Sequence, residues 1–182
     1  RNHLRLNSDS RNGYDVEHFR ALPNQNIAPH LKTHISHEDK RKKKMTFKIV
    51  RFDQKFQNAV VDIWKKCDLT TPQNDPAEDL KRKLESQPEL FFIGLLDGKV
   101  VGTVMAGYEG HRGWINYLAV APEHQRHGYG RQLMQKATEE LTKIGCPKVN
   151  LQVRKSNTEV IDFYKHLGFK EDDVISLGKR LE

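Results

Sequence analysis

The spacing of apolar residues switches between two periods along the chain from position 46 onward. Apolar residues at every second position predict strands, whereas spacings of three and four predict amphipathic helices. Strand-like segments lie at residues 46–52, 90–97, 99–108, 114–121 and 148–154, with one or two more within 169–181. Helix-like segments lie at residues 53–67, 76–87, 131–144 and 156–167.

This order of segments predicts an α/β domain of the mixed α+β kind. Its central sheet is expected to be mixed but mostly antiparallel, with six to seven strands flanked by about four helices. The dipeptide Asp97-Gly98 joins two of the strands and is typical of a tight hairpin. The expected helix caps are Asp53, Asp75 and a capping box formed by Ser156 with Glu159.

Residues 1–44 differ from the rest of the chain because they show no sustained period. They mix Asn, Ser, His, Arg and Pro with scattered single apolar residues. We expect them to form a disordered basic N-terminal extension, so that the folded domain comprises residues 45–182. Met45 opens the first strand, and we expect it to be the natural start of the protein, with residues 1–44 extraneous.

The net charge of +7 belongs mainly to this N-terminal segment. Residues 1–44 hold 10 Lys/Arg and 5 Asp/Glu, whereas residues 45–182 hold 21 and 19. The basic run at residues 40–44 is compatible with contact to nucleic acid or an anionic membrane, but such a run is more often a solvated tail. Because the folded part is nearly balanced in charge, we expect no nucleic-acid and no membrane partner.

Cysteine usage and hydropathy favour a cytoplasmic setting. The sequence contains no apolar run long enough to span a bilayer, and we expect no signal peptide. The two cysteines, Cys67 and Cys146, do not have the spacing of metal ligands. We expect both to be buried free thiols, which is typical of a reducing compartment.

A glycine-containing loop at residues 125–130 lies between a predicted strand and a predicted helix. The first amides of a helix have no intrahelical acceptor and carry partial positive charge, so they attract anions. Gly128 and Gly130 lack a Cβ, which lets the backbone approach a phosphate closely, and Arg126 and Arg131 add cationic donors. This pattern predicts a diphosphate site, although the loop by itself is equally compatible with a simple turn.

Two common phosphate-binding motifs are excluded. The P-loop string Gly-x-x-x-x-Gly-Lys-Ser/Thr does not occur in the chain. The dinucleotide fingerprint requires Gly or Ala three residues after its second glycine, where this chain has Leu133. The pattern that remains, Gln-x-x-Gly-x-Gly, is similar to the pyrophosphate loop of the GNAT acyltransferases, which use acetyl-coenzyme A.

The rest of residues 45–182 also resembles the GNAT superfamily. One matching block is residues 117–122 leading into the loop, and a second comprises residues 151–157, 163–164 and 167–169. The spacing Asn-x6-Tyr-x3-Gly-Phe in the second block is more specific than the loop alone. Segments at residues 67–69, 74–76, 107–113 and 176–180 are similar to the YpeA-type bacterial acetyltransferases.

The resemblance implies a GNAT fold and direct transfer of an acetyl group from acetyl-coenzyme A, as co-substrate, to a primary amine. We expect no metal, because His124 and His127 have no third ligand of suitable type close to them in the sequence. The resemblance also implies that Leu118 and Val120 pair with the pantetheine arm and that the Val120 amide stabilises the developing oxyanion. The residues implied to hold the diphosphate are Gln125, Arg126, Gly128, Gly130 and Arg131.

Two further roles follow from the resemblance. Asn157 is implied to contact the coenzyme arm, with a helix cap or turn residue as the alternative. Tyr164 is implied to protonate the leaving thiolate, a transfer that is only mildly uphill for a phenol because a thiol has a pKa of ~8.5. The alternative for Tyr164 is a core tyrosine with a satisfied hydroxyl.

The acceptor is not legible in the sequence. A small-molecule amine and a peptide α-amine or lysine are both open, as are a monomer and a homodimer. Glu109 is a candidate general base acting through water, or else an exposed loop carboxylate, and Asn116 and Tyr117 are expected at the acceptor groove. A catalytically silent module that binds acetyl-coenzyme A as a sensor is the alternative from another functional class.

Overall fold

The computed structural model describes residues 45–70 and 75–181, and the predicted N-terminal extension lies outside these ranges. The described strands are β1 (Phe47–Arg51), β2 (Phe91–Leu96), β3 (Lys99–Tyr108), β4 (Gly113–Val120) and β5 (Val149–Asn150). The α-helices are α1 (Gln57–Lys66), α2 (Pro76–Glu85), α3 (Tyr129–Lys143) and α4 (Thr158–His166). Short 3-10 helices lie at Gln54–Phe56, Pro88–Leu90 and Pro122–His124.

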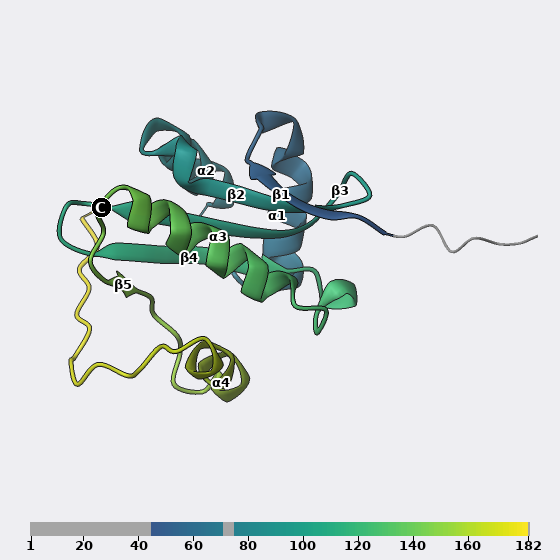
Figure 1. The fold of residues 1–182 in the computed structure, drawn as a ribbon. Coiled ribbons are helices and arrows are strands. Elements are labelled where there is room, and N and C mark those ends of the chain that lie inside the picture. Colours follow the sequence, from purple (N-terminus) through teal and green to yellow (C-terminus); the bar gives the residue numbers. More distant parts are fainter. Residues whose placement is uncertain (1–44, 71–74, 182) are drawn as a thin grey trace, which may run out of the picture. The chain divides into compact units, whose positions relative to one another are not determined.

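The strands form one sheet in the order β1-β2-β3-β4-β5 (Figure 1). The first four strands are antiparallel, whereas β5 pairs with β4 in parallel. The β2–β3 hairpin turns at Asp97 and Gly98, which both have positive φ of 48° and 84°, as predicted for this dipeptide. The predicted fold class, a mixed α/β domain with a mostly antiparallel sheet, is confirmed.

Two hydrophobic clusters cover the two faces of the sheet. The first combines α1 and α2 with the sheet, and its members include Trp64, Leu80 and Phe91. The second combines α3 and α4 with the opposite face, and it includes Leu133 and Tyr164. All six residues of β2 are buried because both of its faces are covered, which explains the continuous apolar run in its sequence.

Two helical segments begin at the side-chain caps that the sequence predicts. The last helix, α4, also has a side-chain cap, but at a different residue from the one predicted. The Asp53 carboxylate accepts a hydrogen bond from the amide of Lys55, and the Asp75 carboxylate accepts one from the amide of Ala77. The capping box predicted at Ser156 is wrong, because Asn157 is the cap and accepts from the amide of Val160 at 3.4 Å. Asn is as good a cap as Ser, so the helix begins one residue later than predicted.

The predicted strand count of six to seven is too high for the described residues, which contain five strands. The strand predicted at 148–154 is paired only over two residues, and the segment after α4 forms no strand. That segment contacts the β5 region through side chains instead of a backbone ladder. Its contacts there are Lys148 to Asp172 at 2.6 Å and Gln152 to Ser176 at 2.5 Å.

Two further sequence expectations can be compared with this fold. Cys67 and Cys146 are free, as predicted, but each is only partly buried. In the described part of the chain, no helix has the length and apolar character needed to cross a membrane.

Candidate functional site

A β-bulge in β4 organises the site. Thr103 of β3 stands opposite Ala119, and Met105 stands opposite Asn116, so β4 has one residue more than β3 between these pairs. Tyr117 lies at this extra position and has a φ of +50°, which is uncommon for a residue other than glycine. The bulge is therefore a specific, locally costly feature that its surroundings must hold in place.

A buried hydrogen-bond chain holds the bulge. Trp64 of α1 donates its indole N–H to the Thr103 hydroxyl at 3.0 Å, and that hydroxyl donates to the Tyr117 carbonyl at 2.7 Å. Thr103 has no exposed surface and is the one buried polar side chain of the described residues. The Trp64 ring also stacks on the Tyr117 ring, with 4.0 Å between centroids.

The bulge changes which face of the sheet each residue of β4 occupies. Ile115, before the bulge, packs in the α3–α4 cluster, and so do Leu118 and Val120 after it. Tyr117 and Ala119 instead pack in the α1–α2 cluster. A strand without a bulge would place Ile115, Tyr117 and Ala119 on one face, because side chains alternate with a period of two.

The edge of β4 that faces β5 is open over most of its length. The two strands pair only at Gly113 with Val149 and Trp114 with Asn150, and they diverge beyond these residues (Figure 1). Ala121 donates its backbone N–H to Val101 of β3 at 2.9 Å. Because successive amides of a strand point to opposite edges, the N–H of Val120 points toward the open side.

The glycine loop connects this open edge to the start of α3. Gly128 is the N-cap of α3 with a φ of +79°, and no side chain caps the first amides of the helix. A Cβ at Gly128 would meet no atom within 4 Å, so the space there is open. A Cβ at Gly130 would lie 3.4 Å from the ring of Phe163, an ordinary van der Waals contact, so the first turn of α3 lies close to α4.

The other residues predicted to hold the diphosphate lie around the same loop. The Gln125 side chain donates to the carbonyl of Val120 at 3.0 Å and so ties the loop to the end of β4. Arg126 has a φ of +64° and forms an exposed ion pair with Glu159 at 3.3 Å. Arg131 is exposed on the first turn of α3. An exposed pair of this kind stabilises little, so Arg126 can exchange Glu159 for another anion.

Tyr164 lies in the same cluster as the side chains of Leu118 and Val120. It is 9% exposed, and its ring packs edge-on against Phe163 and Phe169 at centroid distances of 5.1 and 5.6 Å. Burial raises the pKa of the Tyr164 hydroxyl to about 12, so the phenol keeps its proton at neutral pH. The structure thus brings the predicted acid together with the residues predicted to contact the coenzyme arm.

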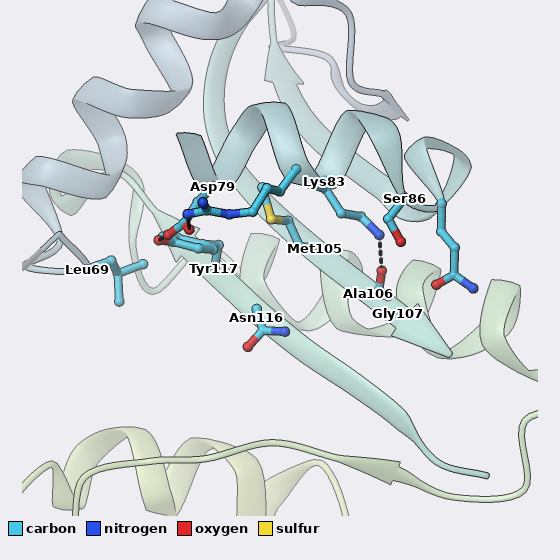
Figure 2. Close-up of a pocket in the computed structure, with 11 residues that line it drawn as sticks. Leu69, Asp79, Lys83, Ser86, Met105, Ala106, Gly107, Asn116 and Tyr117 are labelled. Carbon is cyan, nitrogen blue, oxygen red and sulfur yellow. Dashed lines mark hydrogen bonds and ion pairs between the residues drawn. The ribbon is translucent and has the colours of Figure 1, made fainter. Parts of the chain in front are cut away.

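A pocket of about 620 Å³ lies on the face of the sheet opposite to α3 and α4, between α2 and strands β3 and β4 (Figure 2). The polar residues that line it are Asp79, Arg82, Lys83, Ser86, Gln87, Asn116 and Tyr117. The Tyr117 hydroxyl donates to the Asp79 carboxylate at 2.5 Å, and Arg82 pairs with the other oxygen of Asp79 at 2.8 Å. Burial and the bond to Asp79 both raise the pKa of Tyr117, which keeps it protonated.

The structure does not place Glu109 at this pocket. Glu109 lies in the loop after β3, and its carboxylate accepts hydrogen bonds from the amide of Arg112 at 3.0 and 3.2 Å. Desolvation raises the pKa of Glu109, but hydrogen bonds from backbone amides outweigh this effect and lower it, which makes it a poorer base. No cluster of three potential metal ligands occurs among residues 45–70 and 75–181.

Comparison with known proteins identifies the family. The model of the acetyltransferase (GNAT) family matches residues 57–169. An acetyltransferase of Pectobacterium atrosepticum is 43% identical over 130 residues, which cover 71% of this chain and 92% of that protein. The structure of the ribosomal-protein-S18-alanine N-acetyltransferase from Escherichia coli is 26% identical, with a TM-score of 0.59 over 70% of this chain and 79% of that one.

A third protein shares the fold. The PaiA N-acetyltransferase from Thermoplasma acidophilum, solved in complex with coenzyme A, is 18% identical, with a TM-score of 0.62 over 72% of this chain and 94% of that one. Taken with the matches above, this chain belongs to the GNAT acetyltransferase family. It is an acetyl-coenzyme A-dependent N-acetyltransferase, and the acceptor amine is not specified.

Sequence reasoning missed three residues of the site. Thr103 sits in an apolar strand segment, and only its isolated hydroxyl hints at a special role. Asp79 and Lys83 lie in a charged helix where most side chains are solvated. Their spacing of four residues places them on one helical face, which is a signal that could have been used.

Proposed function

We propose that the acetyl donor binds along the open edge of β4 and that the acceptor amine enters from the pocket beneath α2. The bulge at Tyr117 is the observation that supports this proposal, because it determines which residues at the end of β4 lie on each face of the sheet. Tyr117 faces the pocket, whereas Leu118 and Val120 face the side of α3 and α4. The amine and the donor would therefore meet at the end of β4.

The start of α3 is suited to the diphosphate of the donor. Its first amides have no side-chain cap, and the space at Gly128 is open. Arg126 and Arg131 supply positive charge from the loop and the first turn. Coenzyme A was bound to the PaiA enzyme of the same fold, which supports this use of the site. Asn157 caps α4 through its Oδ1 atom, which leaves its amide nitrogen to contact the coenzyme arm.

The donor supplies an acetyl thioester, and the residues of this chain direct its reaction with the amine. In this proposal Val120 donates its N–H to the carbonyl oxygen as negative charge develops there. The C–N bond forms as the C–S bond breaks, and Tyr164 donates its proton to the departing sulfur. The attacking amine loses its extra proton to water, and Tyr164 is reprotonated from solvent.

Replacement of Tyr164 by Phe tests this assignment. The ring and its packing remain, so we expect the affinity for acetyl-coenzyme A to change only a few-fold. General acid catalysis typically contributes ~10²–10⁴-fold, and kcat should fall by that order. Tyr108→Phe is the matched control, because the Tyr108 hydroxyl donates to the Gly110 carbonyl at 3.0 Å, in the loop after β3.

Two outcomes would contradict the role of Tyr164. A melting temperature that falls while kcat remains nearly normal would show a core tyrosine instead of an acid. An equal fall in kcat for Tyr108→Phe would show that the loss is not specific. The absence of turnover with any amine in a broad panel would favour the catalytically silent sensor instead.

The remaining sequence predictions stay proposals. We propose that residues 45–182 form the GNAT acetyltransferase domain and that it acts in the cytoplasm, as a monomer or homodimer, without a nucleic-acid partner. A peptide α-amine or lysine remains the alternative acceptor to a small molecule. The ribosomal-protein-S18-alanine N-acetyltransferase, at 26% identity, is the observation in favour of a peptide acceptor.

A further inference from the structure

We propose that the pocket beneath α2 selects a small amine that also carries an anionic group, such as a carboxylate or a phosphate. The proposal rests on the proposed function, in which this pocket receives the acceptor. Its volume of about 620 Å³ is within the range typical of small-molecule sites. The charges of its lining then decide which amines it favours.

The lining of the pocket is net positive. Its charged residues are one carboxylate, Asp79, and two cations, Arg82 and Lys83. The carboxylate is already engaged at both oxygens, by Arg82 at 2.8 Å and by the Tyr117 hydroxyl at 2.5 Å. An additional cationic group of a ligand would therefore find no free acidic partner in the lining.

Lys83 supplies the positive charge that is left over. Its ammonium is half-buried and donates to the backbone carbonyl of Ala106 at 2.6 Å, as Figure 2 shows. No carboxylate of the described residues lies within ion-pair distance of it. An ammonium has three donors, so Lys83 can also bind an anion at the pocket surface.

The energetics of Lys83 support the same conclusion. Burial lowers the pKa of Lys83, and the charge of Glu89 offsets this effect only in part. A half-buried ammonium is thus destabilised in the free protein. A ligand anion beside it would relieve this cost and would itself gain a charge-assisted hydrogen bond.

The arrangement of the residues allows one small molecule to reach both ends of the pocket. Asp79 and Lys83 lie one turn apart on the same face of α2, about 6 Å along the helix axis. Tyr117 lies at the Asp79 end, whereas Ser86 and Ala106 lie near Lys83 (Figure 2). The amine would lie at the β4 end and the anion against Lys83.

Matched acceptor pairs test the inference. Each pair combines an anionic amine with a neutral analogue: an amino acid and its amide, and an amino sugar phosphate and the unmodified amino sugar. With acetyl-coenzyme A, the release of coenzyme thiol gives kcat/KM for each. We expect the anionic member to be favoured by about 10–100-fold in at least one pair, the range of a charged hydrogen bond. The pair that responds identifies the anion.

A second experiment assigns the preference to Lys83. In Lys83→Met the preference for the anionic member should fall to about one, because kcat/KM falls much more for the anionic member than for the neutral one. Lys81→Met removes a positive charge from another face of the same helix and should retain the preference. Lys83→Glu should reverse it, an outcome that partial unfolding cannot produce.

The possible failures are distinguishable. Equal use of both members of each pair, or faster use of polyamines, aminoglycosides or peptides, would overturn the anion inference and leave acetyl transfer intact. A preference that survives in Lys83→Met would also overturn it. Failure to acetylate any amine would overturn the proposed function and this inference with it.

Discussion

Replacement of Thr103 by Val is expected to destabilise the domain far more than its small change in shape suggests. The two side chains have nearly the same volume, so no cavity or clash is introduced. The substitution removes the hydroxyl that joins the Trp64 indole N–H to the Tyr117 carbonyl. Both partners then lose a hydrogen bond at a site where Thr103 and Trp64 have no exposed surface.

The magnitude follows from the two groups left unpaired. An unsatisfied buried donor or acceptor costs ~1–3 kcal/mol, and the Tyr117 carbonyl, which is only partly buried, costs near the lower end of that range. We therefore expect a loss of about 2–4 kcal/mol in the free energy of unfolding. For a domain of this size that corresponds to a fall of roughly 6–16 °C in melting temperature.

Two comparison variants make the result specific. Thr103→Ser keeps the hydroxyl and removes one methyl group, which should cost only about 0.5–1.5 kcal/mol. Thr142→Val makes the same chemical change on an exposed turn of α3, where the expected effect is within ~0.5 kcal/mol. Urea unfolding, followed by fluorescence, measures all three.

The same substitution should impair catalysis in the molecules that remain folded. Because Thr103 holds the bulge, its loss lets Tyr117 and Val120 shift, and a misplacement of 1 Å can cost ~10²-fold. We expect kcat/KM to fall by about 10–100-fold in Thr103→Val. If Thr103→Val is as stable and as active as Thr103→Ser, the hydrogen-bond chain does not hold the bulge.

Two further predictions concern the loop and the N-terminal segment. Gly128→Val should weaken acetyl-coenzyme A binding at least tenfold, about 1.4 kcal/mol, because a branched side chain fills the open space at the start of α3. Gly98→Val, at a hairpin with similar positive φ and open space, is the control, and equal affinity in the two variants by calorimetry would contradict the site. A chain that begins at Met45 should keep its melting temperature and turnover, and a loss of several degrees or of most activity would show that residues 1–44 serve the domain.

Most elements of the fold could be predicted because their signals are local. The apolar spacing of α1 to α4, the Asp97-Gly98 turn and the Asp75 cap each depend on a few neighbouring residues. The segment at 148–154 was harder, because alternation of side chains is the same in a paired strand and in an extended segment without partners. Whether a ladder forms depends on the neighbouring backbone, which the pattern does not encode.

The candidate site divides in the same way. The glycine loop and Tyr164 are predicted from motif spacing, which a linear sequence preserves. The bulge could not be predicted, because the residue with positive φ is Tyr117 and not a glycine, which would have marked the position in the sequence. The pocket could be predicted only in part: Asn116 and Tyr117 are expected at an acceptor groove and do line the pocket, but the bond between Asp79 and Tyr117 joins residues 38 positions apart. Only the folded chain brings these two side chains together.

The bulge at Tyr117 also has a consequence for how this enzyme can change. In the proposed function, the residues that contact the acceptor and those that contact the donor come from opposite sides of one strand, and α2 lines only the pocket assigned to the acceptor. Substitutions in α2 can therefore alter acceptor preference while the donor side keeps its geometry. A small library at Asp79, Arg82, Lys83 and Ser86 would be the shortest route to acetyltransferases with new acceptors on this scaffold.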